Sequence, residues 1–218
     1  MRDVALPKGK PAGETHAYCL EEITRMLNVL PEPASTIIAV AAFTGVRKGE
    51  LRGFLWENYH SEQVLISQSF WRGHALEPKT RQSRAPVPVV AQLARRLDSH
   101  RRLSGNPANG LMFPSPAGKP INLDALAADV IMPLVTKAGI LWHGWHAFRR
   151  GLATNLHWLG VSDKTIQRIL RHANVGVTQS CHIKTADFEV VEAMQQFERS
   201  LEYAPNMHLS GAERPRLM

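Results

Sequence analysis

Basic side chains that can surround a phosphate recur along the 218-residue chain in the order Arg47, Lys79, His146, Arg149 and His172. Metal-free transfer of a phosphodiester needs positive donors around the reacting phosphorus, because its equatorial oxygens accumulate negative charge. Guanidinium groups meet this need because each presents a planar fork of N–H donors. Arg47 and Arg149 are therefore candidate phosphate-binding residues.

The surroundings of Arg47 favour a side chain that leaves the core beside an acidic partner. It follows the apolar stretch 37–43 and the turn residue Gly45, and an unpaired charge buried there would cost several kcal/mol. Glu50, one helical turn later, can hold the guanidinium, and a bound phosphate can complete its hydrogen bonds. An ordinary surface ion pair between Arg47 and Glu50 would leave the same pattern in the sequence.

The other members of the set also have simpler explanations when each is taken alone. His146 and Arg149 share a helix face by their spacing, which is common by chance. A lysine in a hairpin, such as Lys79, is usually solvated. His172 at a helix end could be nothing more than a favourable charge at that end. The argument for a site therefore depends on the ordered set.

Mainly helical elements are expected to position these residues. Alternating and β-branched residues over 56–71 and 82–89 predict a small antiparallel sheet, with Lys79 near its hairpin turn. The fold class predicted is mainly α with a small antiparallel β-sheet (α+β). Apolar residues at helical spacing predict helices over about 20–30, 37–43, 89–102, 122–134, 146–159, 162–172 and 187–203, with a short helix over 47–51 that carries Arg47 and Glu50.

Local signals give some of these helices their ends and faces. Asn122 and Ser162 are candidate N-caps, and Pro133 should bend the helix that contains it. In the helix that begins near His146, the apolar residues fall within a narrow arc, and Arg149 sits at the border of that arc. We therefore expect the apolar side to anchor the helix and Arg149 to face a groove.

Composition favours a polyanionic partner and a reducing compartment. The formal charge of +7 and the pI near 9.8 suit nucleic acid, because cations placed on phosphates release condensed counterions. Cys19 and Cys181 are too few for a disulfide framework or a zinc finger, and the cytoplasm is the expected location. The apolar stretch 37–43 is far shorter than the roughly 20 residues that span a bilayer, so no membrane segment is expected.

Four motifs stand in a fixed order: Thr44-Gly45-Val46-Arg47 with Glu50-Leu51, Lys79-Thr80 ahead of Pro86-Val87-Pro88, His146-Ala147-Phe148-Arg149, and Leu170-Arg171-His172-Ala173-Asn174. Together they resemble the active-site sequence of the tyrosine recombinases, the phage integrase family. The resemblance covers about residues 15–203 and implies the family's catalytic-domain fold. One difference is Arg171, which precedes His172 where the family often has glycine.

The resemblance implies a role for each matched residue. Arg47 and Arg149 would clamp the scissile phosphate, and Lys79 would protonate the departing 5′ oxygen. His146 and His172 would donate to the phosphate or assist proton transfer. The family acts on duplex DNA in site-specific recombination or integration, so duplex DNA and self-association on it are the expected partners. No metal, nucleotide or other cofactor and no small-molecule substrate is implied, because a covalent phosphoryl-enzyme conserves the phosphodiester energy.

At the position where the family carries its nucleophilic tyrosine, this chain has His182. One hypothesis is a site that binds phosphate but is deficient in cleavage. A second is attack by the imidazole of His182 on phosphorus, which would give a hydrolysis-prone P–N intermediate. A third is a tyrosine supplied by a partner subunit, although a second copy of this sequence would lack it at the same position.

Two further readings come from other functional classes. A non-catalytic DNA-binding module that keeps the integrase fold is the main alternative. A metal-dependent nuclease using His143 and His146 is a more distant one, and a zinc site from these two residues with Cys181 and His182 is disfavoured because adjacent ligands share one ion poorly. The domain organisation predicted is a linker over 1–14, a catalytic domain over 15–203 and a flexible tail over 204–218.

Overall fold

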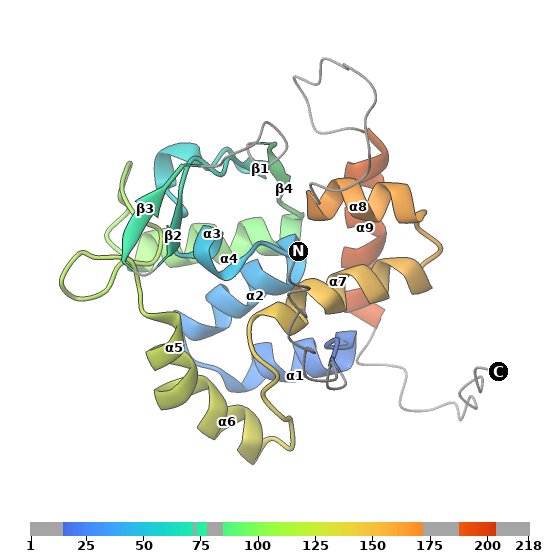
Figure 1. Ribbon diagram of the computed structural model, residues 1–218, viewed down its shortest axis with the longest axis horizontal. Coiled ribbons are helices and arrows are strands. Elements are labelled where there is room, and N and C mark those ends of the chain that lie inside the picture. Colours follow the sequence, from blue (N-terminus) through green and yellow to red (C-terminus); the bar gives the residue numbers. More distant parts are fainter. Residues whose placement is uncertain (1–14, 72, 78–84, 172–187, 204–218) are drawn as a thin grey trace, which may run out of the picture.

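The computed structural model describes residues 15–71, 73–77, 85–171 and 188–203 of the chain (Figure 1). The two ends expected to be a linker and a tail lie outside these ranges. The helices are α1 (Leu20–Val29), α2 (Ala34–Thr44), α3 (Lys48–Leu51), α4 (Ala91–Leu103), α5 (Leu123–Leu126), α6 (Met132–Lys137), α7 (His146–Trp158), α8 (Asp163–Leu170) and α9 (Phe188–Tyr203), with a 3-10 turn η1 (Trp56–Asn58) and a π-helical stretch η3 (Ala127–Ile131). The strands are β1 (Gln63–Val64), β2 (Ser69–Trp71), β3 (His74–Leu76) and β4 (Val87–Pro88).

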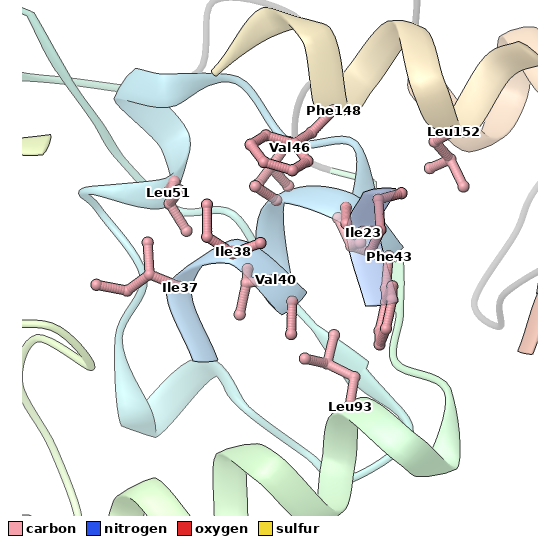
Figure 2. Packing of buried hydrophobic residues seen from close by; sticks show 14 of the residues in the cluster. Ile23, Ile37, Ile38, Val40, Phe43, Val46, Leu51, Leu93, Phe148 and Leu152 are labelled. Carbon is pink, nitrogen blue, oxygen red and sulfur yellow. The ribbon is translucent and has the colours of Figure 1, made fainter. Parts of the chain in front are cut away.

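Helix α2 is the centre of the core. All of its residues are buried, and it packs against α1, α4 and α7. Figure 2 shows its Ile37, Ile38 and Phe43 among Leu93 of α4 and Phe148 of α7. Burial of each such side chain contributes about 1.5–3 kcal/mol to folding. Because α2 is apolar on every side, it is enclosed, and the elements that carry functional residues are assembled around it.

The predicted antiparallel pairing is confirmed, but the described strands form two separate two-stranded sheets. β1 pairs with β4, with Gln63 opposite Pro88 and Val64 opposite Val87. β2 and β3 form a hairpin. Proline has no backbone N–H to donate, so the flanks of Val87 can support only a short ladder with β1. The ladder between β1 and β4 is accordingly only two residues long on each strand.

The predicted caps at Asn122 and Ser162 are confirmed, and near Pro133 the structure shows a change of helix type. The Asn122 side chain accepts hydrogen bonds from the backbone N–H groups of Asp124 and Ala125, and the Ser162 hydroxyl accepts one from Thr165. Between α5 and α6 the helix passes through η3, directly ahead of Pro133. Since proline lacks the N–H that the helical ladder requires, the local change of helix type has a direct cause.

Helices α7, α8 and α9 pack together beside the central helix (Figure 1). Phe148, Leu152 and Leu156 of α7 are fully buried, which confirms the apolar side predicted for this helix. Among the residues that the structure describes, no helix has the length and apolarity to cross a bilayer. The result is a mainly helical α+β fold in which the ends of α2 and α8 meet the first turn of α7.

Candidate functional site

The turn after α2 brings the Arg47 segment against α7 and α8. Gly45 has a φ of +60°, a left-handed conformation that glycine adopts without strain. A Cβ at this position would lie 2.7 Å from Cδ2 of Leu170 and 3.0 Å from Cδ2 of Leu152. Glycine therefore suits the turn, and a larger residue would also have to displace the terminal methyl groups of Leu170 and Leu152.

Arg47 is the N-cap residue directly ahead of α3 and is held by Glu50, as predicted. Its backbone N–H donates to Oε2 of Glu50 at 2.8 Å, and its Nη1 donates to Oε1 at 2.9 Å. The Arg47 side chain keeps 41% of its surface exposed, whereas that of Glu50 keeps 8%. Glu50 thus holds the Arg47 side chain where it emerges from the core. The guanidinium has further N–H groups that can donate to a bound ligand.

Arg149 is buried, which corrects the expectation that it faces a groove from the border of the apolar arc. It is 3% exposed, with Nη1 donating to the carbonyl of Gly45 at 2.6 Å and Nη2 donating to the carbonyl of Leu170. The ends of α2 and α8 cover this side of α7. The hydrophobic pattern of the α7 sequence cannot predict this, because it does not show which other segments pack against the helix. Arg149 therefore joins the turn before Arg47 to the end of α8.

A third arginine, Arg171, completes the group and was not predicted as a site residue. It follows α8 in the left-handed conformation, with φ +54°, and it is 4% exposed. Its Nη2 donates to Oε2 of Glu50 at 2.9 Å. The sequence feature that could have indicated its role is an arginine at a helix end, where glycine is often found. A charged residue in the left-handed conformation indicates that its side chain has a function there.

Arg47, Arg149 and Arg171 around Glu50 are called here the arginine cluster. Burial and the nearby charges of Arg47 and Arg171 lower the pKa of Arg149 to about 10. Burial also lowers the pKa of Arg171, against the opposing effect of Glu50. Burial on its own would raise the pKa of Glu50, but Arg171 and then Arg47 hold it below its ordinary value. Three cations thus share one carboxylate, an arrangement that favours an incoming anion.

His146 is the first residue of α7 and is exposed. Partial desolvation and the charges of Arg149, Arg150 and Arg47 lower its pKa. The imidazole is therefore mainly neutral at pH 7 and can either donate or accept a hydrogen bond. Trp145 fixes the start of the helix, because its indole N–H donates to the carbonyl of Leu123 at 3.2 Å.

The structure brings together some of the predicted site residues. Arg47 and Arg149 belong to the arginine cluster, and the charges of this cluster act on His146. The other predicted members, Lys79, His172 and His182, lie outside the described residues. Their placement and roles remain predictions from the sequence.

The histidines of the metal-dependent alternatives have different surroundings. The ring of His143 stacks on that of His16, with centroids 3.9 Å apart and an interplanar angle of 18°. Its backbone N–H donates to the hydroxyl of Tyr18 at 2.6 Å. In the part of the chain that the structure describes, no three His, Cys, Asp or Glu residues are grouped as metal ligands. Cys181 and His182 lie outside that part.

Comparisons with known proteins agree with the element order and with the motifs. The model of the phage integrase family matches residues 19–185. The chain is 26% identical over 204 residues to the tyrosine recombinase XerC-like protein of Caldanaerobacter subterraneus subsp. tengcongensis, covering 81% of this chain and 52% of that protein. The chain thus spans about half the length of this curated relative.

Solved structures of integrases and recombinases share the fold. The integrase from mycobacterium phage Brujita superposes with a TM-score of 0.62 at 18% identity, over 86% of this chain and 60% of that one. XerA recombinase gives a TM-score of 0.60 at 19% identity, over 95% and 68%. The Tn1549 transposon integrase in complex with transposon right-end DNA gives 0.61 at 16% identity, over 94% and 69%.

Proposed function

Because the chain belongs to the phage integrase family, the tyrosine recombinases, we propose that it binds duplex DNA and contributes the catalytic domain of a site-specific recombinase. The domain takes up most of residues 15–203. Its proposed place of action is the cytoplasm, where copies assemble on paired half-sites. The Tn1549 relative of the same fold is in complex with DNA, which supports this partner.

The observation that carries the proposal is the excess of positive charge in the arginine cluster. Two of its three guanidinium groups, those of Arg149 and Arg171, are almost completely buried. Among the described residues, Glu50 carries the only carboxylate whose charge shifts the pKa of Arg149. A phosphodiester brings negative charge and acceptor oxygens to the exposed guanidinium of Arg47, so it both neutralises and completes the cluster.

The family's chemistry assigns each residue a step. Arg47 binds the scissile phosphate directly, and Arg149 strengthens the field on it while holding the turn at Gly45. The nucleophile forms a bond to phosphorus as the bond to the 5′ oxygen breaks, and Lys79 gives that oxygen its proton. His146 and His172 hold the phosphate oxygens or move the proton of the nucleophile. No metal or other cofactor takes part in these steps.

Cleavage depends on His182, since the chain has no tyrosine at that position. Of the explanations for this difference, we favour a domain that retains phosphate binding and is deficient in strand cleavage. The non-catalytic DNA-binding module is the second candidate function, and the same residue favours it. Both functions require the arginine cluster to bind DNA, and they differ in whether a phosphoryl-enzyme forms.

Binding to a labelled mixed-sequence duplex, measured by fluorescence anisotropy over a range of salt concentrations, tests the shared step. Arg47→Ala should weaken binding and reduce the slope of log affinity against log salt by about one, the value for one lost phosphate contact. Lys137→Ala is the matched control, since it removes one charge from the last turn of α6, which lies away from α8 (Figure 1). Equal affinity and equal slope in wild type and Arg47→Ala would refute the proposal.

A further inference from the structure

We propose that Arg171 is a positioning residue for Arg47, acting through Glu50. The proposal rests on the function proposed above and deepens it, because it names the residue that holds the phosphate-binding guanidinium in place. Arg171 lies beyond α8 and Arg47 lies ahead of α3. The Glu50 carboxylate is the connection between them.

Both oxygens of Glu50 are engaged by the two arginines. Oε1 accepts from Nη1 of Arg47, while Oε2 accepts from the Arg47 backbone N–H and from Nη2 of Arg171. A carboxylate held by three donors on two oxygens cannot rotate without breaking a bond to Arg47. The bond from Arg171 thus restrains the carboxylate plane, and that plane sets the direction of the Arg47 guanidinium.

Arg171 cannot take the phosphate itself in this structure. Its side chain is 2% exposed, whereas that of Arg47 is 41% exposed. Among the residues that the structure describes, its buried Nε and Nη1 have no hydrogen-bond partner. Within the described part of the chain, its side-chain hydrogen bond goes to Glu50, and through that carboxylate Arg171 acts on Arg47.

The backbone conformation at Arg171 indicates that this position needs the arginine side chain. Its φ of +54° is a conformation that glycine adopts without strain and that arginine rarely adopts. A residue kept there only for its backbone would be glycine. The charge of Arg171 is also the largest influence that lowers the pKa of Glu50, ahead of the effects of Arg47, so Arg171 favours the ionised carboxylate that holds Arg47.

The left-handed backbone provides a favourable test. Arg171→Gly keeps the turn and removes only the side chain, and Arg171→Lys keeps a charge that can reach Glu50. We expect Arg171→Gly to weaken binding to the mixed-sequence duplex by about tenfold, within the range for coupled neighbours. Arg171→Lys should recover most of this loss. Lys164→Ala, which removes an exposed charge from α8, is the matched control and should change affinity much less.

A double-mutant cycle separates positioning from other roles. If Arg171 acts through Arg47, then Arg171→Gly should have almost no further effect on binding when Arg47 is already alanine. Equal effects in the two backgrounds would overturn the proposal, and so would unchanged affinity in Arg171→Gly. If Arg171→Gly fails to fold, Arg171→Asn carries the same comparison, because asparagine removes the charge and tolerates the left-handed backbone. Loss of affinity in Arg47→Ala without loss in either Arg171 variant would refute this inference alone, whereas no loss in Arg47→Ala would refute the proposed function.

Discussion

Nη2 of Arg171 donates a hydrogen bond to Oε2 of Glu50 across 2.9 Å, joining residues 121 positions apart in the chain. The contact ties the end of α8 to the start of α3, where the same carboxylate holds Arg47. Arg149 makes a second connection between these segments through the carbonyls of Gly45 and Leu170. The arginine cluster therefore serves the fold and the proposed phosphate site together.

Neutralising Glu50 should destabilise the protein strongly. Glu50→Gln keeps the size of the side chain but leaves Arg171 buried without its anion, so the free energy of unfolding should fall by about 3 kcal/mol. Urea unfolding at pH 7 measures it. Asp124→Asn removes the exposed partner of Lys48 and should cost less than about 1 kcal/mol. Equal, small losses in both variants would contradict a structural role for the buried pair.

The contribution of Glu50 should depend on pH in the acid range. Since its folded pKa lies below the ordinary value of 4.5, the stability that it contributes is fully present above pH 4.5 and is lost as the pH falls through the folded pKa. The difference in unfolding free energy between wild type and Glu50→Gln should thus be constant from pH 7 to about 5 and then shrink. A difference that grows on acidification would mean that the folded pKa is raised.

Arg149→Lys should loosen the connection between the ends of α2 and α8. A single ammonium cannot reproduce the fork that reaches the carbonyls of both Gly45 and Leu170, and an unsatisfied buried carbonyl should lower the unfolding free energy by about 2 kcal/mol. DNA affinity should fall as well, because the turn ahead of Arg47 loses its support. Arg150→Lys is the neighbouring control, since Arg150 donates to the carbonyl of His16 outside the cluster. A larger effect at Arg150 would contradict the assignment.

Gly45→Ala should be more harmful than the same change at another glycine with positive φ. At Gly45 the new methyl group would meet Leu170 at 2.7 Å, whereas at Gly118, where φ is +70°, nothing lies within 4 Å. Gly118→Ala should cost about 1 kcal/mol from backbone strain alone. Gly45→Ala should add at least about 1 kcal/mol of overpacking. Thermal unfolding of the two variants measures the difference in stability. Equal losses of stability would contradict the prediction, because they would show that Leu170 moves aside at no cost.

His182→Tyr tests whether the rest of the site is competent for cleavage. On a nicked duplex selected from a random-sequence pool for binding, the tyrosine variant should form a covalent protein–DNA adduct that the wild type does not form. Adding Arg47→Ala should reduce adduct formation by about 10²-fold, as for loss of one oxyanion donor. Adduct in the wild type that disappears in His182→Ala would instead support attack by histidine. Absence of adduct in His182→Tyr would contradict the roles proposed for the other site residues.

Features determined by neighbouring residues could be predicted from the sequence. The enclosed helix α2 follows from its continuous apolar stretch, and the caps at Asn122 and Ser162 follow from side chains that reach N–H groups two or three residues away. The pair of Arg47 and Glu50 follows from a spacing of one helical turn. The resemblance to the family follows in the same way, because the motifs that carry it are short and ordered along the chain.

Features that depend on distant segments required the tertiary structure. The burial of Arg149 depends on the ends of α2 and α8, and the division of the strands into two sheets depends on which partner each strand meets. The part played by Arg171 depends on Glu50, far away in the chain. Periodicity and capping describe a chain's own neighbourhood, whereas burial and ion pairing are set by whatever folds against it. The sequence by itself therefore determined which basic residues this protein has to offer, and only packing decided which of them share one carboxylate.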